Sequence, residues 1–115
     1  MNIFPGRILA QSRPSSTSAA SAYAIAAHNR AEIRKIVVSN TSLNPATFRI
    51  FHDEDGTTYD ETTSLFWDIP IDNGETVSLE EHFWMDGRKS GNFAVRSSAS
   101  NALTFTVYGA EEKVK

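Results

Sequence analysis

The chain has 115 residues and a mass of 12.7 kDa, with 40% hydrophobic and 22% charged residues, which is typical of one compact domain and excludes a two-domain enzyme. It has no cysteine, so disulfides, thiolate metal sites and cysteine nucleophiles are excluded. Eleven Lys and Arg against fourteen Asp and Glu give a net charge of −3, which is the wrong sign for neutralising phosphates, and we expect no nucleic-acid partner.

The first 18 residues are interpreted as an arm and linker, and residues 19–115 as a β-sandwich domain. The first ten residues are mildly apolar and lead into the polar run 11–18, which has little to bury. This segment is either a frayed terminus or an arm that docks on another subunit. The candidate docking residues are Ile3, Phe4, Ile8 and Leu9. Because no apolar run approaches the roughly 20 residues that span a bilayer, we expect neither a membrane anchor nor a signal peptide.

Beyond the arm, apolar residues alternate with polar ones at period two, which indicates half-buried β-strands. The Ala-rich segment 18–28 is the one helix candidate, but Tyr23 and Ile25 lie two apart and favour a short strand. Asn, Asp, Gly and Pro between the strands supply turns. The expected strands are 7–11, 21–26, 32–40, 47–52, 64–71, 76–83, 92–97 and 103–108. We therefore predict an all-β fold: an antiparallel β-sandwich or jelly roll of about eight strands with an extended N-terminal arm.

The loop 52–61 carries five carboxylates and suggests a calcium site at Asp53, Asp55 and Asp60. The start resembles an Asp-x-Asp-Gly calcium loop, but position 62, where the full motif has Glu, is Thr. The competing interpretation is a turn at Asp55-Gly56 with solvated acids, and it is preferred. No cofactor is therefore expected, with calcium kept as the lesser alternative.

Catalysis is not expected. His28, His52 and His82 have no spacing that would place two imidazoles on one metal ion. There is also no Gly-x-Ser-x-Gly sequence, which marks the nucleophile of many serine hydrolases.

Two adjacent aromatic pairs, Phe66-Trp67 and Phe83-Trp84, lie in strands that could pair with each other. Neighbouring residues of a strand point to opposite faces, so one aromatic of each pair must point away from the core of its own domain. The four rings could be core, a sugar-binding platform or a contact surface. We favour a subunit interface for the outward rings, because exposed aromatics of this size commonly mark contact surfaces.

Four stretches of the chain carry strand motifs in a recognisable order: 33–42, 46–53, 69–71 with 74–79, and 101–110. The first ends in an Asn-Thr turn, the second contains Thr-Phe-Arg, the third contains Thr-Val-Ser-Leu, and the last has the pattern Phe-x-Val-x-Gly. This order of motifs resembles small β-sandwich virion proteins of tailed bacteriophages. The acidic loop and the polar run 86–91 have no counterpart in that pattern.

The resemblance implies a structural role in a virion, assembled in the host cytoplasm. It points to a capsid decoration or cement protein, with a tail, neck or fibre component as the alternative. The expected partners are further copies of this chain, with a trimer favoured, and the major capsid protein or other virion proteins. A rival of another class is a carbohydrate-binding β-sandwich module that uses exposed aromatics and calcium; a small hydrolase ranks third.

Overall fold

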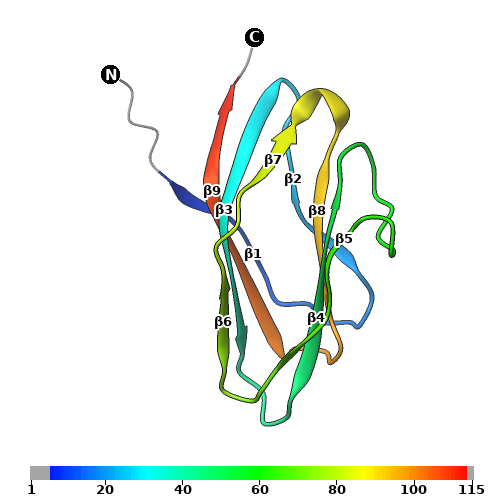
Figure 1. Ribbon diagram of the computed structural model, residues 1–115, viewed down its shortest axis with the longest axis vertical. Helices are drawn as coiled ribbons and strands as arrows, with labels where there is room; N and C mark the ends of the chain where they lie inside the picture. The colour runs from blue at the N-terminus through cyan, green and yellow to red at the C-terminus, as the bar shows by residue number, and fades with distance from the viewer. Residues whose placement is uncertain (1–5, 114–115) are drawn as a thin grey trace.

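The computed structural model describes residues 6–113, which form two antiparallel β-sheets packed face to face (Figure 1). Sheet A contains β1 (Arg7–Ser12), β9 (Leu103–Lys113), β3 (Asn29–Asn40), β6 (Thr76–Leu79) and β7 (Phe83–Asp86). Sheet B contains β2 (Ala20–Ala24), β8 (Asn92–Ser97), β4 (Ala46–Asp53) and β5 (Ser64–Ile71), in that spatial order. The predicted β-sandwich is therefore confirmed.

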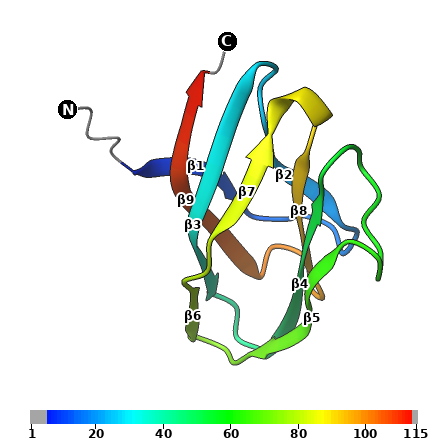
Figure 2. The same ribbon diagram turned by 45° about the horizontal axis from the view of Figure 1, so that its top comes forward.

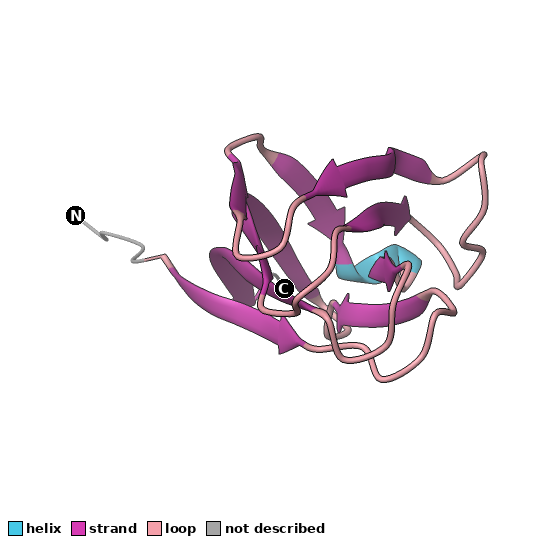
Figure 3. Cartoon of the chain, turned by 90° about the horizontal axis from the view of Figure 1, so that it is seen from below, coloured by secondary structure: helices cyan, strands magenta, loops and turns pink. Residues whose placement is uncertain are grey.

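The long strands β3 and β9 form the centre of sheet A, with β1 along the free side of β9 and both β6 and β7 along the free side of β3 (Figure 2). Figure 3 looks along the long axis and shows η1 (Gly87–Lys89), the only helical segment of residues 6–113. None of the described helical structure is long and apolar enough to cross a membrane.

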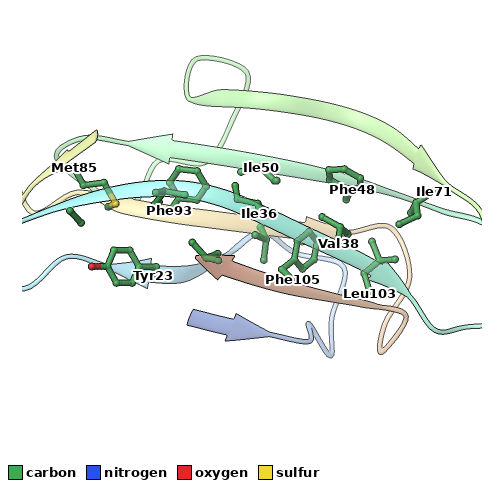
Figure 4. Packing of buried hydrophobic residues seen from close by; sticks show 14 of the residues in the cluster. Tyr23, Ile36, Val38, Phe48, Ile50, Ile71, Met85, Phe93, Leu103 and Phe105 are labelled. Carbon is green, nitrogen blue, oxygen red and sulfur yellow. The ribbon is translucent and has the colours of Figure 1, made fainter. Parts of the chain in front are cut away.

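The core lies between the sheets and is built from the inward residues of both (Figure 4). Phe48 of sheet B meets Phe105 of sheet A edge to face, with the ring centroids 6.1 Å apart. Phe83 and Phe93 make a second contact across the layers at 5.6 Å. Aromatic pairs of this kind add to the free energy gained by burying the rings.

A polar contact also joins the sheets at one end of the core. The hydroxyl of Tyr23 on β2 donates to the carboxylate of Glu111 on β9, and Asn29 Nδ2 donates to the same carboxylate at 2.5 Å. Burial, together with the bond to Glu111, raises the pKa of Tyr23. Burial opposes the charge on Glu111, but the bonds from Tyr23 and Asn29 outweigh it and lower the pKa of that carboxyl.

The expected strand 76–83 is wrong as a single element. It is divided into β6 and β7, and residues 80–82 between them belong to neither strand. Both strands pair with β3, β6 beside Ile36–Ser39 and β7 beside Arg30–Ile33, and β3 has a register shift against β9 between Ile33 and Lys35. The interruption between β6 and β7 therefore lies beside the register shift in β3.

The segment expected to be an arm contributes a strand to this domain. Residues 7–12 form β1, which pairs with β9 of the same chain. Of the four candidate docking residues, Ile3 and Phe4 lie outside the described residues. Leu9 packs partly against the core of its own domain, whereas Ile8 is 45% exposed.

Candidate functional site

The structure separates the two aromatic pairs. Phe66-Trp67 lies on β5, which pairs with β4, and Phe83-Trp84 lies on β7, which pairs with β3, so the two strands belong to different sheets and do not pair. Phe66 and Phe83 pack partly against the core. Trp67 and Trp84 face outward and are 39% and 70% exposed. Each pair thus has one ring on each face, as the strand geometry requires.

Trp67 belongs to a small cluster on the outer face of sheet B. Its ring meets Phe51 at 6.2 Å, and Phe51 also contacts Tyr59 from the loop 54–63. Phe51 is buried although it points away from the main core, because this loop and Trp67 cover it. Trp67 therefore has neighbours within its own domain.

Arg49 completes this cluster. Its guanidinium carbon lies 3.5 Å from the centroid of the Trp67 ring, and its Nε and Nη2 donate to the two carboxylate oxygens of Asp68 at 2.6 and 3.1 Å. The hydrogen bond from Arg49 lowers the pKa of Asp68. A paired guanidinium over an aromatic ring combines a cation–π contact with a bidentate ion pair.

Trp84 has a different environment on the outer face of sheet A. It lies on an edge strand and separates two shallow hollows. The smaller hollow is lined by Arg30, Ala31, Glu32, Arg34, Ala110 and Glu112, and the larger one by Arg30, His52, Glu54, Met85, Asp86, Arg88 and Lys89. Within residues 6–113 no ring or guanidinium is stacked on Trp84, so most of the indole is available to a partner.

The charged residues around Trp84 pair with one another. Arg34 Nε and His82 Nδ1 both approach the carboxylate of Glu32, at 3.0 and 2.5 Å, and lower its pKa, with Arg34 as the larger cause. Arg30 Nη2 lies 2.7 Å from Glu112 Oε2. These pairs fix the positions of side chains beside the indole.

The acidic loop folds as a turn around Asp53. One carboxylate oxygen of Asp53 accepts from the backbone N–H of Thr58 at 2.8 Å and the other from Asp55 at 3.2 Å, and these bonds lower its pKa. Asp60 accepts from Thr62, through both its backbone and its hydroxyl group. In the part of the chain that the structure describes, no three His, Asp or Glu side chains are grouped to hold a metal ion.

The three histidines lie in three different environments. His82 contacts Glu32, whereas His52 stacks on Phe93 at 5.5 Å and has no hydrogen-bond partner at Nε2 among the described residues. Burial lowers the pKa of His52 and favours its neutral form. His28 is an exposed turn residue with φ of 66°.

Sequence reasoning missed two parts of these surfaces. The contact of Arg49 with Trp67 has no signal in the sequence, because it depends on the bulge at which Asp68 adopts φ of 51°. The exposure of Tyr108, which is 38% exposed and pairs with Ile8 across β9 and β1, was not predicted either.

Comparison with known proteins identifies no family: no family model matches this chain, and no curated protein matches it.

Proposed function

We propose that this chain is a structural protein of a phage virion, a capsid decoration or cement protein that assembles into a homo-oligomer on the shell. The observation that supports this most strongly is Trp84, a large aromatic that is 70% exposed on a rigid sheet and is not stacked on any ring or guanidinium in the described chain. An exposed aromatic residue of this kind contributes most to the free energy of binding when a partner buries it.

The resemblance to phage virion proteins agrees with this function. Its segments form β3, β4, β6 and β9, with the end of β5. The resemblance also includes Gly109, for which the structure gives a reason: a Cβ there would lie 2.0 Å from the carbonyl oxygen of Glu32. A tail, neck or fibre component would use the same β-sandwich and the same exposed indole of Trp84.

The experiment is labelling of particles. Antibodies raised against the purified chain are applied to purified virions of the phage whose genome encodes it, and bound gold is located by electron microscopy. Regular labelling over the capsid supports a decoration protein, and labelling confined to the tail supports the alternative. Particles that carry no label, while the same antibodies detect the chain in lysates, would contradict a virion role.

Deletion of residues 1–18 is unsuitable as a test, because it removes β1 from sheet A. Deletion of residues 1–5 leaves every described strand intact. If the N-terminal segment attaches the protein to the shell, this shorter deletion abolishes binding to stripped particles while the thermal unfolding midpoint is unchanged.

Carbohydrate binding is the candidate of another class, and one observation favours it. Trp84 stands beside hydrogen-bonding side chains of both kinds, with donors on Arg30 and Arg88 and acceptors on Glu54 and Asp86. A glycan array distinguishes the two functions: binding that Trp84→Ala removes would favour the sugar module. A calcium-dependent form of this module would use Asp53, Asp55 and Asp60, and repeating the array with a chelator tests it.

A further inference from the structure

Asn73 and Gly74 form the only Asn-Gly pair in the chain. They occupy the middle of a four-residue turn, which is closed by a hydrogen bond from the backbone N–H of Glu75 to the carbonyl oxygen of Asp72 at 3.0 Å. This turn connects β5 of sheet B to β6 of sheet A (Figure 1). All four of its residues are exposed, so water reaches the side-chain amide of Asn73.

The turn requires a glycine at position 74. Gly74 has φ of 76°, a left-handed conformation that residues with a Cβ adopt only with strain. The absence of a Cβ also leaves the nitrogen of Gly74 open to close approach by the side chain before it. Cγ of Asn73 and this nitrogen can therefore close a five-membered ring, and Asn-Gly is the sequence in which that closure is least hindered.

The nitrogen of Gly74 is held by another part of the chain. Its N–H donates to the carbonyl oxygen of Asn40, the last residue of β3, at 2.9 Å, and the N–H of Asn40 donates to the carbonyl oxygen of Glu75 at the same distance. Asn40 is itself only 1% exposed, and its Nδ2 donates to the carbonyl oxygen of Ile71 at 3.1 Å. Because a nitrogen that keeps its proton in a hydrogen bond is a poor nucleophile, the folded turn opposes the ring closure that its sequence favours.

We propose that Asn73 is a site of spontaneous deamidation, and that opening of the turn away from the end of β3 controls the rate. When the turn opens, hydroxide from the solvent takes the proton of the Gly74 nitrogen. This nitrogen forms a bond to Cγ of Asn73 while the bond between Cγ and Nδ2 breaks, and ammonia leaves after taking a proton from water. Water then adds to either carbonyl of the cyclic imide and opens the ring, which leaves Asp or isoaspartate at position 73.

The two products have different effects on the fold. Asp adds one negative charge beside Asp72 and Glu75 and leaves the length of the backbone unchanged. Isoaspartate places the side-chain methylene in the main chain, so the turn becomes longer by one atom. The hydrogen bonds between the turn and Asn40 lie directly before the pairing of β6 with β3, which begins where Thr76 is opposite Ser39. We therefore expect isoaspartate, and not Asp, to weaken the attachment of β6 to β3.

The first test follows the purified chain during long incubation at neutral pH, both folded and in guanidinium chloride, by mass spectrometry of its proteolytic peptides. The peptide that contains Asn73 is expected to convert from amide to carboxyl at least about fivefold faster in guanidinium, since loss of one such hydrogen bond corresponds to about that factor. If Asn73 remains an amide in guanidinium, it is not a deamidation site. Equal rates in the two states would refute the control by the turn.

Asn101 is an internal control in the same digest. Like Asn73 it is exposed in a turn, but the next residue is Ala102, whose Cβ crowds the peptide nitrogen. In guanidinium, where both sites have lost their structure, Asn101 is expected to convert several-fold more slowly than Asn73. Comparable rates would show that Gly74 does not determine the site.

The second test measures the effect of the modification on stability. The aged chain is separated by ion exchange into unmodified, Asp and isoaspartate forms, and Asn73→Asp supplies the Asp product directly. The isoaspartate form is expected to unfold about 4 °C or more below the unmodified chain, whereas Asn73→Asp keeps the unmodified midpoint. Equal midpoints for the unmodified and isoaspartate forms would refute the expected effect on β6.

The matched control is Asn73→Gln, which keeps a neutral amide but would have to close a larger ring. Aged in parallel, this variant is expected to show neither the new forms nor the lower midpoint. The same loss of stability in Asn73→Gln would show that ageing acts elsewhere in the chain. All of these outcomes are independent of the virion role, because the reaction needs only the chain and water.

Discussion

The guanidinium of Arg49 lies over the indole of Trp67, with 3.5 Å between its carbon and the ring centroid, and the next residue after that tryptophan binds the same guanidinium. One of the two outward tryptophans is therefore covered by its own chain. Trp84, on the other sheet, has no such cover in the described structure and stays 70% exposed. The difference indicates that Trp67 stabilises its own domain, and it supports the proposal that Trp84 contacts a partner.

Substitution of the two tryptophans is expected to separate these roles. Trp67→Ala removes contacts with Phe51 and Arg49 and is expected to lower the free energy of unfolding by about 1–3 kcal/mol. Trp84→Ala is expected to change it by less than about 0.5 kcal/mol in the monomer, as surface substitutions do. Urea unfolding measures both. An equally large loss for Trp84→Ala, measured at a concentration where the chain is monomeric, would contradict the assignment.

Gly109→Ala is expected to be strongly destabilising. A Cβ at this position would lie 2.0 Å from the carbonyl oxygen of Glu32 on β3, and backbone atoms cannot move aside without breaking the pairing of the two central strands. We expect a loss of about 3 kcal/mol or more. Gly6→Ala is the control, because the nearest atom to its Cβ is the end of the Arg34 side chain at 3.4 Å. Wild-type-like unfolding of Gly109→Ala would show that β3 and β9 are not as close as described.

The contact between Tyr23 and Glu111 predicts a pH dependence of stability. Tyr23 has a pKa above its ordinary value of 10.0 in the folded state, so its contribution is complete below about pH 10 and is lost as the pH rises further. Glu111 has a pKa below its ordinary value of 4.5, so its contribution is present above about pH 4.5 and is lost as the pH falls.

Tyr23→Phe removes this bond and is expected to cost about 1–3 kcal/mol near neutral pH. The difference in unfolding free energy between wild type and Tyr23→Phe should be largest between about pH 5 and 10 and should narrow on both sides. Chemical unfolding across that range measures it. A difference that is constant with pH would mean that the hydroxyl and the carboxylate are not coupled.

The acidic loop is expected to be stabilised by its own backbone rather than by calcium. Asp53→Ala leaves the N–H groups of Thr58 and Asp55 without their acceptor and is expected to lower the free energy of unfolding by about 1–3 kcal/mol. Asp53→Asn keeps one acceptor oxygen and should lose less. Millimolar calcium should leave the wild-type melting temperature unchanged; a clear rise in calcium, reversed by a chelator, would instead indicate a cation site.

Much of the fold could be predicted because local patterns and tertiary structure agree. The strands 64–71 and 92–97 coincide with β5 and β8, since each is a run of apolar and β-branched residues between turn signals. The outward direction of one ring in each aromatic pair follows from strand geometry alone. Which of the two rings faces outward could not be predicted, because the alternation of residues does not show which face of a strand packs against the core.

Other features depend on contacts between distant residues. The stack of Arg49 on Trp67 requires the bulge at Asp68, which adopts φ of 51°. The division of 76–83 requires that β3 accept two short partners along one side. The burial of Phe51 on an outer face requires the loop 54–63 to fold over it. None of these three features can be predicted from the residues of its own segment, because each depends on contacts with another part of the chain.

The native mass of the purified chain at micromolar concentration tests the account most directly, because assembly into a homo-oligomer is its central claim. Sedimentation equilibrium over a range of concentrations is expected to give three times the chain mass of 12.7 kDa. A single-chain mass at every concentration would contradict the claim.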